Sequence, residues 1–251
     1  MTSPEGRTTG SLTIVGAGIK PGRHLTQEAR VHIERADKVL YLLAEPPTSD
    51  WIEGMNPSAE SLAPLYEPGR PHAEVYEALV TAMLDRVRRG EHVCVVTYGN
   101  PAVFDQSSHE TVRRAREEGF TAKILPGISA LDCLFVDLGI DPGQDGFQCF
   151  EASEFLRLGK VPDPTVPLVL WQISVIGETV TTGTVNWDGL TTLATALAQR
   201  YGPDHEVVVY EANPFPIGQP LIERCAVRDL ASASVTGMST LYVPPAVVAE
   251  P

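Results

Sequence analysis

One strand-length apolar run ends in residue types that suit a ligand loop. Residues 95–104 read VVTYGNPAVF, and the run stops at Tyr98, Gly99, Asn100 and Pro101. A β-branched run that stops at Gly-x-Pro is typical of a buried strand that feeds an exposed loop. Ligands of open α/β sheets bind at the carboxyl ends of such strands. The loop is therefore the first place to expect a cofactor, although a plain turn would give the same local pattern.

Two other groups of residues are weaker candidates for a ligand or metal site. Gly16 and Gly18 follow an apolar run, but the third glycine falls at Gly22, which does not fit the dinucleotide fingerprint. We interpret the pair as a tight turn at the floor of a cleft. Asp105 and His109 lie beside the loop without further ligands at helical spacing, which favours helix capping and solvation over a metal site. No metal site is predicted.

The composition is that of an ordinary globular protein. The chain has 251 residues, of which 43% are hydrophobic and 20% charged, and its formal net charge is -13. This acidic balance argues against a nucleic-acid or anionic-membrane binder, because both partners attract basic faces. Four widely spaced cysteines predict reduced thiols rather than a zinc cage or a disulfide framework. The N-terminus is polar and no apolar run approaches the ~18 residues that span a bilayer, so we expect a cytoplasmic protein.

The first half of the chain alternates strands and helices. The apolar periods predict strands at residues 11–15, 38–43, 93–97 and 122–125, and helices at residues 26–36, 74–89, 108–118 and 129–138. A capping box of Ser107 and Glu110 is expected to begin the third helix. Residues 45–71 are predicted to form an irregular segment of a length typical of functional loops.

The second half is patterned differently. Strands are predicted at residues 148–150, 167–173, 206–210, 221–226 and 239–243, with one clear helix at residues 188–201. Strand-rich sequence with few crossovers favours a mixed or antiparallel sheet. We therefore predict an α/β protein of two lobes with flexible ends. These are a mostly parallel α/β lobe at residues 10–127, a mixed α+β lobe at residues 128–246, and ends at residues 1–9 and 247–251.

Several short motifs, taken in order, resemble a known family. They are GSLTIVG at residues 10–16, YGNPAVF at 98–104, LPGISA at 125–130, DLGIDP at 137–142, FEAS at 150–153 and STLYVPP at 239–245. Together they resemble the tetrapyrrole-methylase-like class of S-adenosylmethionine methyltransferases, and within it the borosin peptide-backbone α-N-methyltransferases. The resemblance implies the tetrapyrrole-methylase-like fold with a cofactor cleft between its two lobes. It also implies S-adenosylmethionine as cofactor and S-adenosylhomocysteine as product.

The ending resembles the split members of the borosin branch, in which enzyme and precursor peptide are separate chains. The sequence stops soon after Pro244 and Pro245, which leaves no room for the clasp and core peptide of fused members. The resemblance therefore implies a homodimer that methylates backbone amides of a ribosomal precursor peptide in trans.

Methylation of a backbone amide needs help from the protein. The amide nitrogen is a poor nucleophile because its lone pair is delocalised. Transfer therefore requires proton removal, stabilisation of an imidate-like oxygen and alignment with the methyl group. A tyrosine phenolate is a plausible base if a neighbouring cation lowers its pKa. The resemblance places such groups at Tyr66 and Tyr76 in the segment LYEPGRPHAEVY, with Tyr98 at the cofactor loop.

Three positions depart from the family pattern. His72 stands where the family has an arginine four residues before the second tyrosine. An imidazole can carry positive charge near neutral pH but lacks the planar fork of a guanidinium, and Arg70 is an alternative source of that charge. Asn100 replaces a common histidine, and Ala102 replaces a usual glycine. The His72 departure leaves open slow catalysis, a different acceptor or no amide methylation.

The resemblance also implies a set of cofactor contacts, since the donor needs apolar walls for adenine and polar groups for its edges. They are Tyr98, Asn100, Val103 and Phe104 in the loop, Ser129 and Ala130 at the next helix start, and Gln172, Tyr210, Ala212, Met238, Ser239 and Thr240 in the second lobe. Gln172 is expected to point to the cleft from a strand, opposite Trp171. A helix N-cap explains Ser129 equally well.

Two other classes of function stay open. A small-molecule C-methyltransferase of the tetrapyrrole type would share the fold, but carboxylate-rich substrates favour a cleft lined with Arg and Lys. Few basic residues lie near the predicted loops. A non-catalytic module that binds the cofactor or the precursor is supported by the His72 departure alone. A His72→Arg variant separates these classes, because a large gain in rate would indicate a weakened methyltransferase.

Overall fold

The computed structural model describes residues 10–43, 46–215 and 217–246. The chain divides into two compact units. Unit 1 runs to Ala130 and includes Pro214–Pro216, and unit 2 comprises Leu131–Asn213 and the remainder from Ile217. The ends that the sequence predicts to be flexible lie outside the described residues, and the predicted lobe limits stay a prediction.

Unit 1 is built on a parallel sheet. Its strands are β1 (Ser11–Gly16), β2 (Lys38–Leu42), β3 (Glu60–Ser61), β4 (His92–Thr97) and β5 (Thr121–Ile124). They lie in the order β3-β2-β4-β1-β5, and every neighbouring pair is parallel. Strands β1 and β4 are buried along almost their whole length, as expected for parallel strands with helices on both faces.

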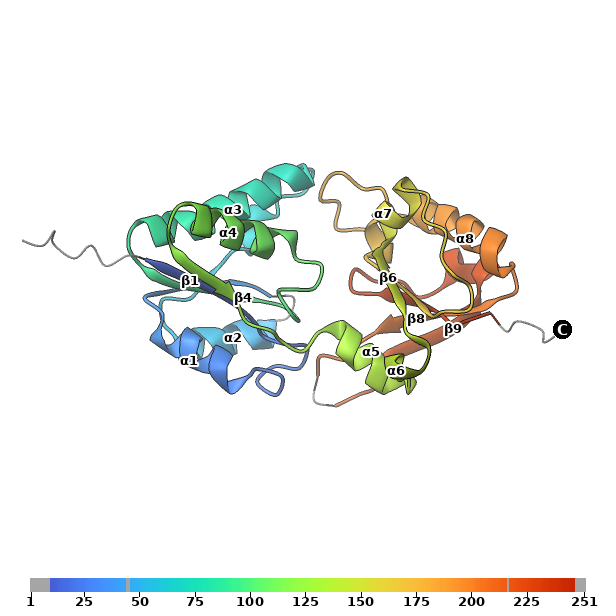
Figure 1. The fold of residues 1–251 in the computed structure, drawn as a ribbon, viewed down its shortest axis with the longest axis horizontal. Coiled ribbons are helices and arrows are strands. Elements are labelled where there is room, and N and C mark those ends of the chain that lie inside the picture. The colour runs from blue at the N-terminus through green and yellow to red at the C-terminus, as the bar shows by residue number, and fades with distance from the viewer. Residues whose placement is uncertain (1–9, 44–45, 216, 247–251) are drawn as a thin grey trace, which may run out of the picture. The chain divides into compact units, whose positions relative to one another are not determined.

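Helices cover both faces of this sheet (Figure 1). They are α1 (Gln27–Arg35), α2 (Pro46–Met55), α3 (His72–Arg88) and α4 (Gln106–Glu117). Alternate residues of β4 belong to different cores: Val95 packs in the cluster of α3 and α4, and Val96 in the cluster of α1. This alternation fixes which side chains of β4 lie beneath α3.

Two sequence predictions in unit 1 are wrong. Residues 45–71 are not irregular throughout, because they contain helix α2, strand β3 and a short 3-10 helix, η1 (Ala63–Leu65). Adjacent prolines suggested a loop, yet the first positions of a helix tolerate proline. Helix α4 is capped by Asp105 rather than Ser107: the Asp105 carboxylate accepts hydrogen bonds from the Ser108 N–H at 3.0 Å and the Ser107 hydroxyl at 2.8 Å. A carboxylate can take several donors at once.

Unit 2 carries the mixed sheet that the sequence predicts. Its strands are β6 (Gln148–Glu151), β7 (Leu168–Trp171), β8 (Glu206–Glu211), β9 (Leu221–Ala226) and β10 (Thr240–Val243). The order is β6-β7-β10-β8-β9, with β6 and β7 parallel and the other pairs antiparallel. The predicted α/β fold class, with one parallel and one mixed sheet, is confirmed.

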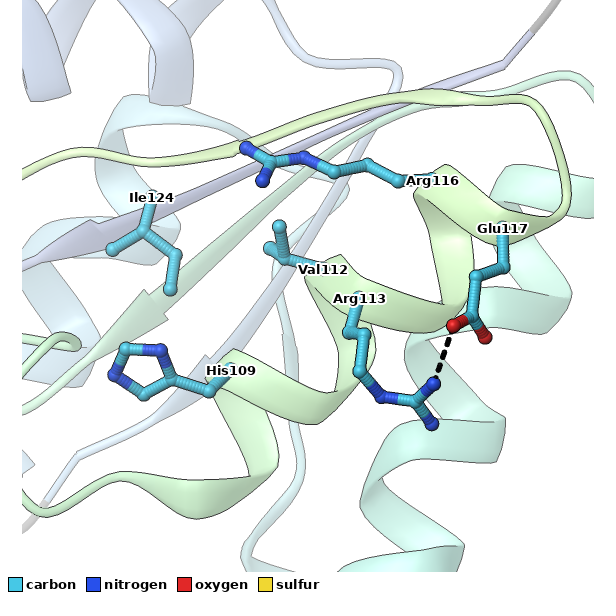
Figure 2. A pocket seen from close by; sticks show the side chains of 6 residues that line it. All are labelled: His109, Val112, Arg113, Arg116, Glu117 and Ile124. Carbon is cyan, nitrogen blue, oxygen red and sulfur yellow. Dashed lines mark hydrogen bonds and ion pairs between the residues drawn. The ribbon is translucent and has the colours of Figure 1, made fainter.

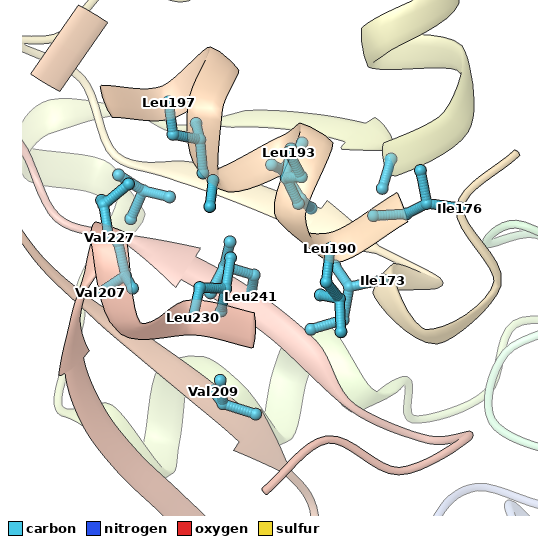
Figure 3. Packing of buried hydrophobic residues seen from close by; sticks show 14 of the residues in the cluster. Ile173, Ile176, Leu190, Leu193, Leu197, Val207, Val209, Val227, Leu230 and Leu241 are labelled. Carbon is cyan, nitrogen blue, oxygen red and sulfur yellow. The ribbon is translucent and has the colours of Figure 1, made fainter. Parts of the chain in front are cut away.

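One long helix closes the core of unit 2 (Figure 3). The helical segments are α5 (Ala130–Leu138), α6 (Pro142–Asp145), α7 (Ala152–Arg157), η2 (Ile173–Val175), α8 (Trp187–Tyr201) and η3 (Val227–Ser232). Leu190, Leu193 and Leu197 of α8 lie at helical spacing and pack in one cluster with Val209 and Leu241 of the sheet. Full burial of one such side chain stabilises the fold by roughly 1.5–3 kcal/mol. Within the described residues, no helix is both long and apolar enough to cross a membrane.

Candidate functional site

The connectivity of the parallel sheet marks one edge of unit 1. Strands β1 and β4 are neighbours, but the chain leaves them toward opposite sides of the sheet, from β1 to β2 and from β4 to β5. Loops that diverge in this way open a crevice at the carboxyl ends of the two strands, where open α/β sheets bind ligands. The segments that leave this edge are residues 16–18 after β1 and residues 98–105 after β4.

Backbone segments meet at this edge without room for a side chain. The Gly99 N–H donates to the Gly18 carbonyl at 3.1 Å, and the Gly18 N–H donates to the Gly99 carbonyl at 3.1 Å. A Cβ on Gly16 would lie 2.1 Å from the Gly99 oxygen, and a Cβ on Gly127 would lie 2.6 Å from the same oxygen. The chain segments that follow β1, β4 and β5 are thus held in contact, and each contact requires glycine.

Two hydrogen bonds hold the loop after β4 at Ala102, and its backbone is strained near its end. The Asn100 side-chain oxygen accepts the Ala102 N–H at 3.0 Å, and the His109 Nε2 lies 3.2 Å from the Ala102 carbonyl. Phe104 has φ of 52° and its side chain is exposed. A bulky side chain in this left-handed region costs energy, and such strain clusters at functional sites.

Tyr66 ends η1 on the face of the sheet that α3 covers. Its N–H donates to the Ala63 carbonyl at 3.0 Å, and its ring packs against the same hydrophobic cluster as the ring of Tyr76. Burial, followed by the electrostatic effects of Tyr76 and Asp105, raises the pKa of Tyr66 to about 12. All three causes favour the neutral phenol, so Tyr66 is a hydrogen-bond donor at neutral pH and not a phenolate base.

The two candidate cations lie in different surroundings. His72 begins α3, and its ring stacks on Tyr76 with centroids 6.2 Å apart and planes at 29°. The Arg70 guanidinium donates to the Leu65 carbonyl at 3.3 Å and lies 4.0 Å from the Glu74 carboxylate. His72 therefore has a ring contact with a candidate tyrosine, whereas Arg70 donates one hydrogen bond to a backbone oxygen and lies at ion-pair distance from Glu74.

Unit 1 holds all five predicted catalytic residues, on two segments. Tyr66, Arg70, His72 and Tyr76 belong to η1, the turn after it and α3, whereas Tyr98 leaves β4. The Tyr98 N–H donates to the Leu42 carbonyl at 3.2 Å, which fixes the start of the loop.

The predicted cofactor contacts of unit 1 surround the glycine contacts. Asn100, Val103 and Phe104 lie in the loop, Ser129 is buried, and Ala130 begins α5. The Cα of Ser129 lies 4.0 Å from the position of a Cβ on Gly99. The loops after β4 and β5 therefore converge, as a shared ligand edge requires.

The predicted contacts of unit 2 have mixed surroundings. Tyr210 is fully buried and its hydroxyl donates to Asp137 at 2.8 Å. The Ser239 hydroxyl accepts the Thr236 N–H at 2.9 Å. Ala212 and Thr240 are buried as well, whereas Met238 is 40% exposed. As cofactor contacts, these residues stay a prediction.

Gln172 does not lie in a strand, contrary to the sequence prediction. Strand β7 ends at Trp171, and Gln172 has φ of 57° at the start of η2. Among the described residues other than glycine, Phe104 and Gln172 are the two with positive φ. Gln172 directly follows β7, and Phe104 lies in the loop after β4. The alternation of side chains along a strand does not predict a left-handed backbone in the residues after it.

Sequence reasoning missed one polar residue at the edge of unit 1. Thr97, the last residue of β4, is 5% exposed, and its hydroxyl oxygen is buried without a hydrogen-bond partner. The signal available was a hydroxyl at the end of an otherwise apolar strand.

Two further features of the described residues bear on the chemistry. They contain no group of three or more His, Cys, Asp or Glu residues that could hold a metal ion. A pocket of about 460 Å³ runs along α4 beside the end of β5 (Figure 2). Its lining includes Arg113, whose guanidinium lies 2.6 Å from the Glu117 carboxylate. Apart from His109 it shares no residue with the edge described above.

Known proteins that resemble the chain in sequence combine a methyltransferase with a peptide precursor. The methyltransferase and precursor of the ribosomally synthesized cyclic gymnopeptides, from Gymnopus fusipes, is 37% identical over 256 residues, covering 100% of this chain and 61% of that protein. The corresponding protein for omphalotin A, from Omphalotus olearius, is 37% identical over 242 residues, covering 94% and 58%. This chain thus spans about three fifths of the length of these relatives.

Solved structures and a family model agree on the fold. A cobalt precorrin-4 methyltransferase matches with a TM-score of 0.69 and 21% identity, covering 96% of this chain and 97% of that one. The uroporphyrin-III-C-methyltransferase of Thermus thermophilus matches with a TM-score of 0.66 and 19% identity, covering 95% and 93%. The model of the tetrapyrrole (corrin/porphyrin) methylases matches residues 11–218. The chain therefore belongs to the tetrapyrrole methylase family of methyltransferases.

Proposed function

We propose that the chain is an S-adenosylmethionine-dependent α-N-methyltransferase that acts on backbone amides of a separate precursor peptide. The observation that carries this proposal is the group of Tyr66, His72 and Tyr76, held on one face of a sheet whose carboxyl edge ends in the loop of Tyr98. The sequence relatives named as methyltransferases fused to cyclic-peptide precursors support a peptide acceptor.

The carboxyl edge of the unit 1 sheet suits the methyl donor. It offers a buried hydroxyl without a partner at Thr97 and an exposed aromatic ring at Phe104. These supply the polar and apolar contacts that an adenosyl group and its amino-acid tail require. Once bound, S-adenosylmethionine supplies an electrophilic methyl group. Tyr98, Asn100, Val103, Phe104 and Ser129 would hold it in this unit, with Ala130 beside them.

Tyr66 acts on the oxygen of the acceptor amide in this proposal. Because its phenol stays protonated far above neutral pH, it can donate a hydrogen bond to the amide carbonyl. Negative charge develops on that oxygen as the amide nitrogen loses its proton. A donor placed in a partly buried site stabilises such charge more strongly than water does. Tyr66 is thereby assigned to oxyanion stabilisation and not to proton removal.

Proton removal falls to the stacked pair on α3. An imidazole can accept a proton at neutral pH, and His72 lies against the Tyr76 ring. We assign the Tyr76 hydroxyl to accept a hydrogen bond from the amide N–H, and the His72 imidazole to take up the proton that this nitrogen loses as it forms its bond to the methyl group. Arg70 stays an alternative source of positive charge, since the Leu65 carbonyl uses one of the five N–H donors of its guanidinium.

The proposal extends to the remaining sequence expectations. The precursor is supplied in trans, the enzyme is a homodimer, and the reaction takes place in the cytoplasm. Gln172, Tyr210, Ala212, Met238, Ser239 and Thr240 remain the proposed donor contacts of unit 2.

A second candidate function has specific support. The family model and both solved structures carry tetrapyrrole-related names, which favours C-methylation of a tetrapyrrole. The sequence relatives weigh against it, because they share 37% identity with this chain, whereas the two solved structures share 21% and 19%.

The deciding experiment is intact-mass analysis of a candidate precursor peptide, encoded by a gene next to that of the protein, after incubation with the protein and S-adenosylmethionine. Mass gains in steps of one methyl group, placed on backbone nitrogens by fragmentation, are expected. A Tyr66→Phe variant is the matched control, and its methylation rate should fall about a hundredfold, the scale on which one lost oxyanion donor acts. Binding of S-adenosylhomocysteine without any mass gain would contradict the peptide acceptor.

A further inference from the structure

Thr97 carries a buried polar group that the folded chain leaves unused. Its residue is 5% exposed, and its hydroxyl oxygen is shielded from solvent without a hydrogen-bond partner. Its backbone carbonyl is occupied, since it accepts the Ala17 N–H at 2.8 Å. Burying a hydroxyl without a partner destabilises a protein, and buried polar groups are nearly always paired. An unpaired buried hydroxyl at the edge where open α/β sheets bind ligands therefore needs an explanation.

The alternation of β4 places the Thr97 side chain on the face that bears the candidate tyrosines. Val93 and Val95 pack in the cluster of α3 and α4, against which Tyr66 and Tyr76 also pack. Thr97 follows Val95 by two residues and therefore points to the same face. The Thr97 hydroxyl is thus on the reactive side of the sheet.

The side chains paired with Thr97 in the sheet offer the hydroxyl no acceptor, and it forms no hydrogen bond with the Gly99 carbonyl beside Gly16. Thr97 is paired in register with Leu42 of β2 and Gly16 of β1. Leu42 is apolar, and the place of a Gly16 side chain is taken by the Gly99 carbonyl and the Pro101 ring. The loop that begins at the next residue therefore covers this edge. That same loop holds Phe104, whose backbone lies in the left-handed region.

We propose that the Thr97 hydroxyl is a hydrogen-bonding contact of the methyl donor. This inference rests on the proposed function, because it assigns the loop of residues 98–104 to that donor. A threonine hydroxyl both donates and accepts, which matches the carboxylate, ammonium and ribose groups of S-adenosylmethionine. The donor, rather than the peptide, is the fitting partner because the donor loop starts at Tyr98, directly after Thr97.

The test compares Thr97→Val, which keeps the shape and removes the hydroxyl, with Thr97→Ser, which keeps the hydroxyl. Calorimetry with S-adenosylhomocysteine should show about tenfold weaker binding for the valine variant, the worth of one hydrogen bond to a charged group. The serine variant should bind within about threefold of wild type. Without ligand, the valine variant should melt about 2–4 °C higher, because the unpaired hydroxyl is gone.

Two results would overturn the inference while leaving the proposed function in place. One is equal affinity of wild type and the valine variant for S-adenosylhomocysteine. The other is a lower melting temperature of the unliganded valine variant, since that would mean that the hydroxyl has a partner within the protein. Failure of the wild type to bind S-adenosylhomocysteine would instead remove the proposed function, and this inference with it.

Discussion

The carboxyl edge of the unit 1 sheet and the core of unit 2 differ in what holds them together: backbone contacts at the edge, and packed side chains in the core. At the edge, backbone touches backbone at Gly16, Gly99 and Gly127, and the loop that follows holds a strained aromatic residue. In the core, Leu190 and Leu193 of α8 are fully buried among other aliphatic side chains (Figure 3). The edge gives up side-chain packing for a fixed backbone shape, whereas the core depends on side-chain volume.

This difference indicates which regions of the chain can carry function. Close packing of apolar groups makes a region stable but gives it no chemistry. Strain and an unpaired hydroxyl lower stability, and they persist where binding gives them a use. The contrast predicts that substitutions at the edge and in the core differ in kind, and the following experiments test it.

The largest effect is expected for Gly16→Ala. The new Cβ would lie 2.1 Å from the Gly99 oxygen, and backbone on both sides resists displacement. We expect a loss of more than about 4 kcal/mol in the free energy of unfolding, or an insoluble protein. Gly54→Ala is the control, because nothing lies within 4 Å of its Cβ position in α2. Chemical denaturation of both variants would refute the packing account if their stabilities were alike.

A smaller effect is expected for Leu190→Ala in the core of unit 2. The side chain is fully buried in the cluster around α8, so the variant should lose about 2–5 kcal/mol of unfolding free energy. Its affinity for S-adenosylhomocysteine should stay that of wild type at temperatures where it is folded. Leu158→Ala, at a residue that is 50% exposed, should leave both quantities unchanged. Weaker ligand binding by the Leu190 variant would break the contrast between the two regions.

Removal of the Tyr66 hydroxyl should change how stability depends on pH. Folding raises the pKa of this phenol from 10.0 to about 12, so the folded state holds the proton more tightly than the unfolded state. The resulting stability is fully present below pH 10 and is lost as the pH rises toward about 12. Wild type should therefore lose more stability than Tyr66→Phe over that range, as urea midpoints at several pH values would show. Parallel curves would contradict the burial of this phenol.

The smallest effect is expected on the outer side of α4. Arg113 forms ion pairs with Glu110 and Glu117, both at 2.6 Å, on an exposed surface. Ion pairs of this kind contribute little because water and salt screen them. Arg113→Gln should therefore leave the melting temperature and the methylation rate unchanged. A drop in methylation rate would indicate that the pocket along α4 takes part in the reaction.

The sequence predicts the elements of this fold better than their long-range contacts. Strand β4 and its Gly-x-Pro loop follow from local pattern, as does helix α8 with its leucines at helical spacing. The contact of Gly127 with Gly99 joins residues far apart in the chain, and no local period encodes it. The sequence mispredicts the segment of α2, because prolines that begin a helix have the same local pattern as prolines that break one.

The candidate site shows the same division. The family resemblance predicts Tyr66, His72 and Tyr76 on adjoining segments, yet the raised pKa of Tyr66 depends on its burial and on Tyr76 and Asp105, which folding brings near it. The left-handed backbone of Gln172 and the unpaired hydroxyl of Thr97 are properties of tertiary packing. The residue types glutamine and threonine do not by themselves predict a left-handed backbone or an unpaired hydroxyl.

The glycine contacts also decide which parts of this scaffold can be retargeted. Random libraries at Gly16 or Gly127 would return mostly unfolded chains, since any side chain there meets backbone. The turn before α3 has more space, because nothing lies within 4 Å of a Cβ at Gly69, although Gly69 itself has φ of 80° and favours glycine. A library over Glu67, Pro68, Pro71 and Ala73 would therefore vary the surroundings of the proposed acceptor site and leave Gly69, His72 and the loop of residues 98–104 unchanged. If the proposed function holds, the start of α3 is the place to vary in a search for new acceptors.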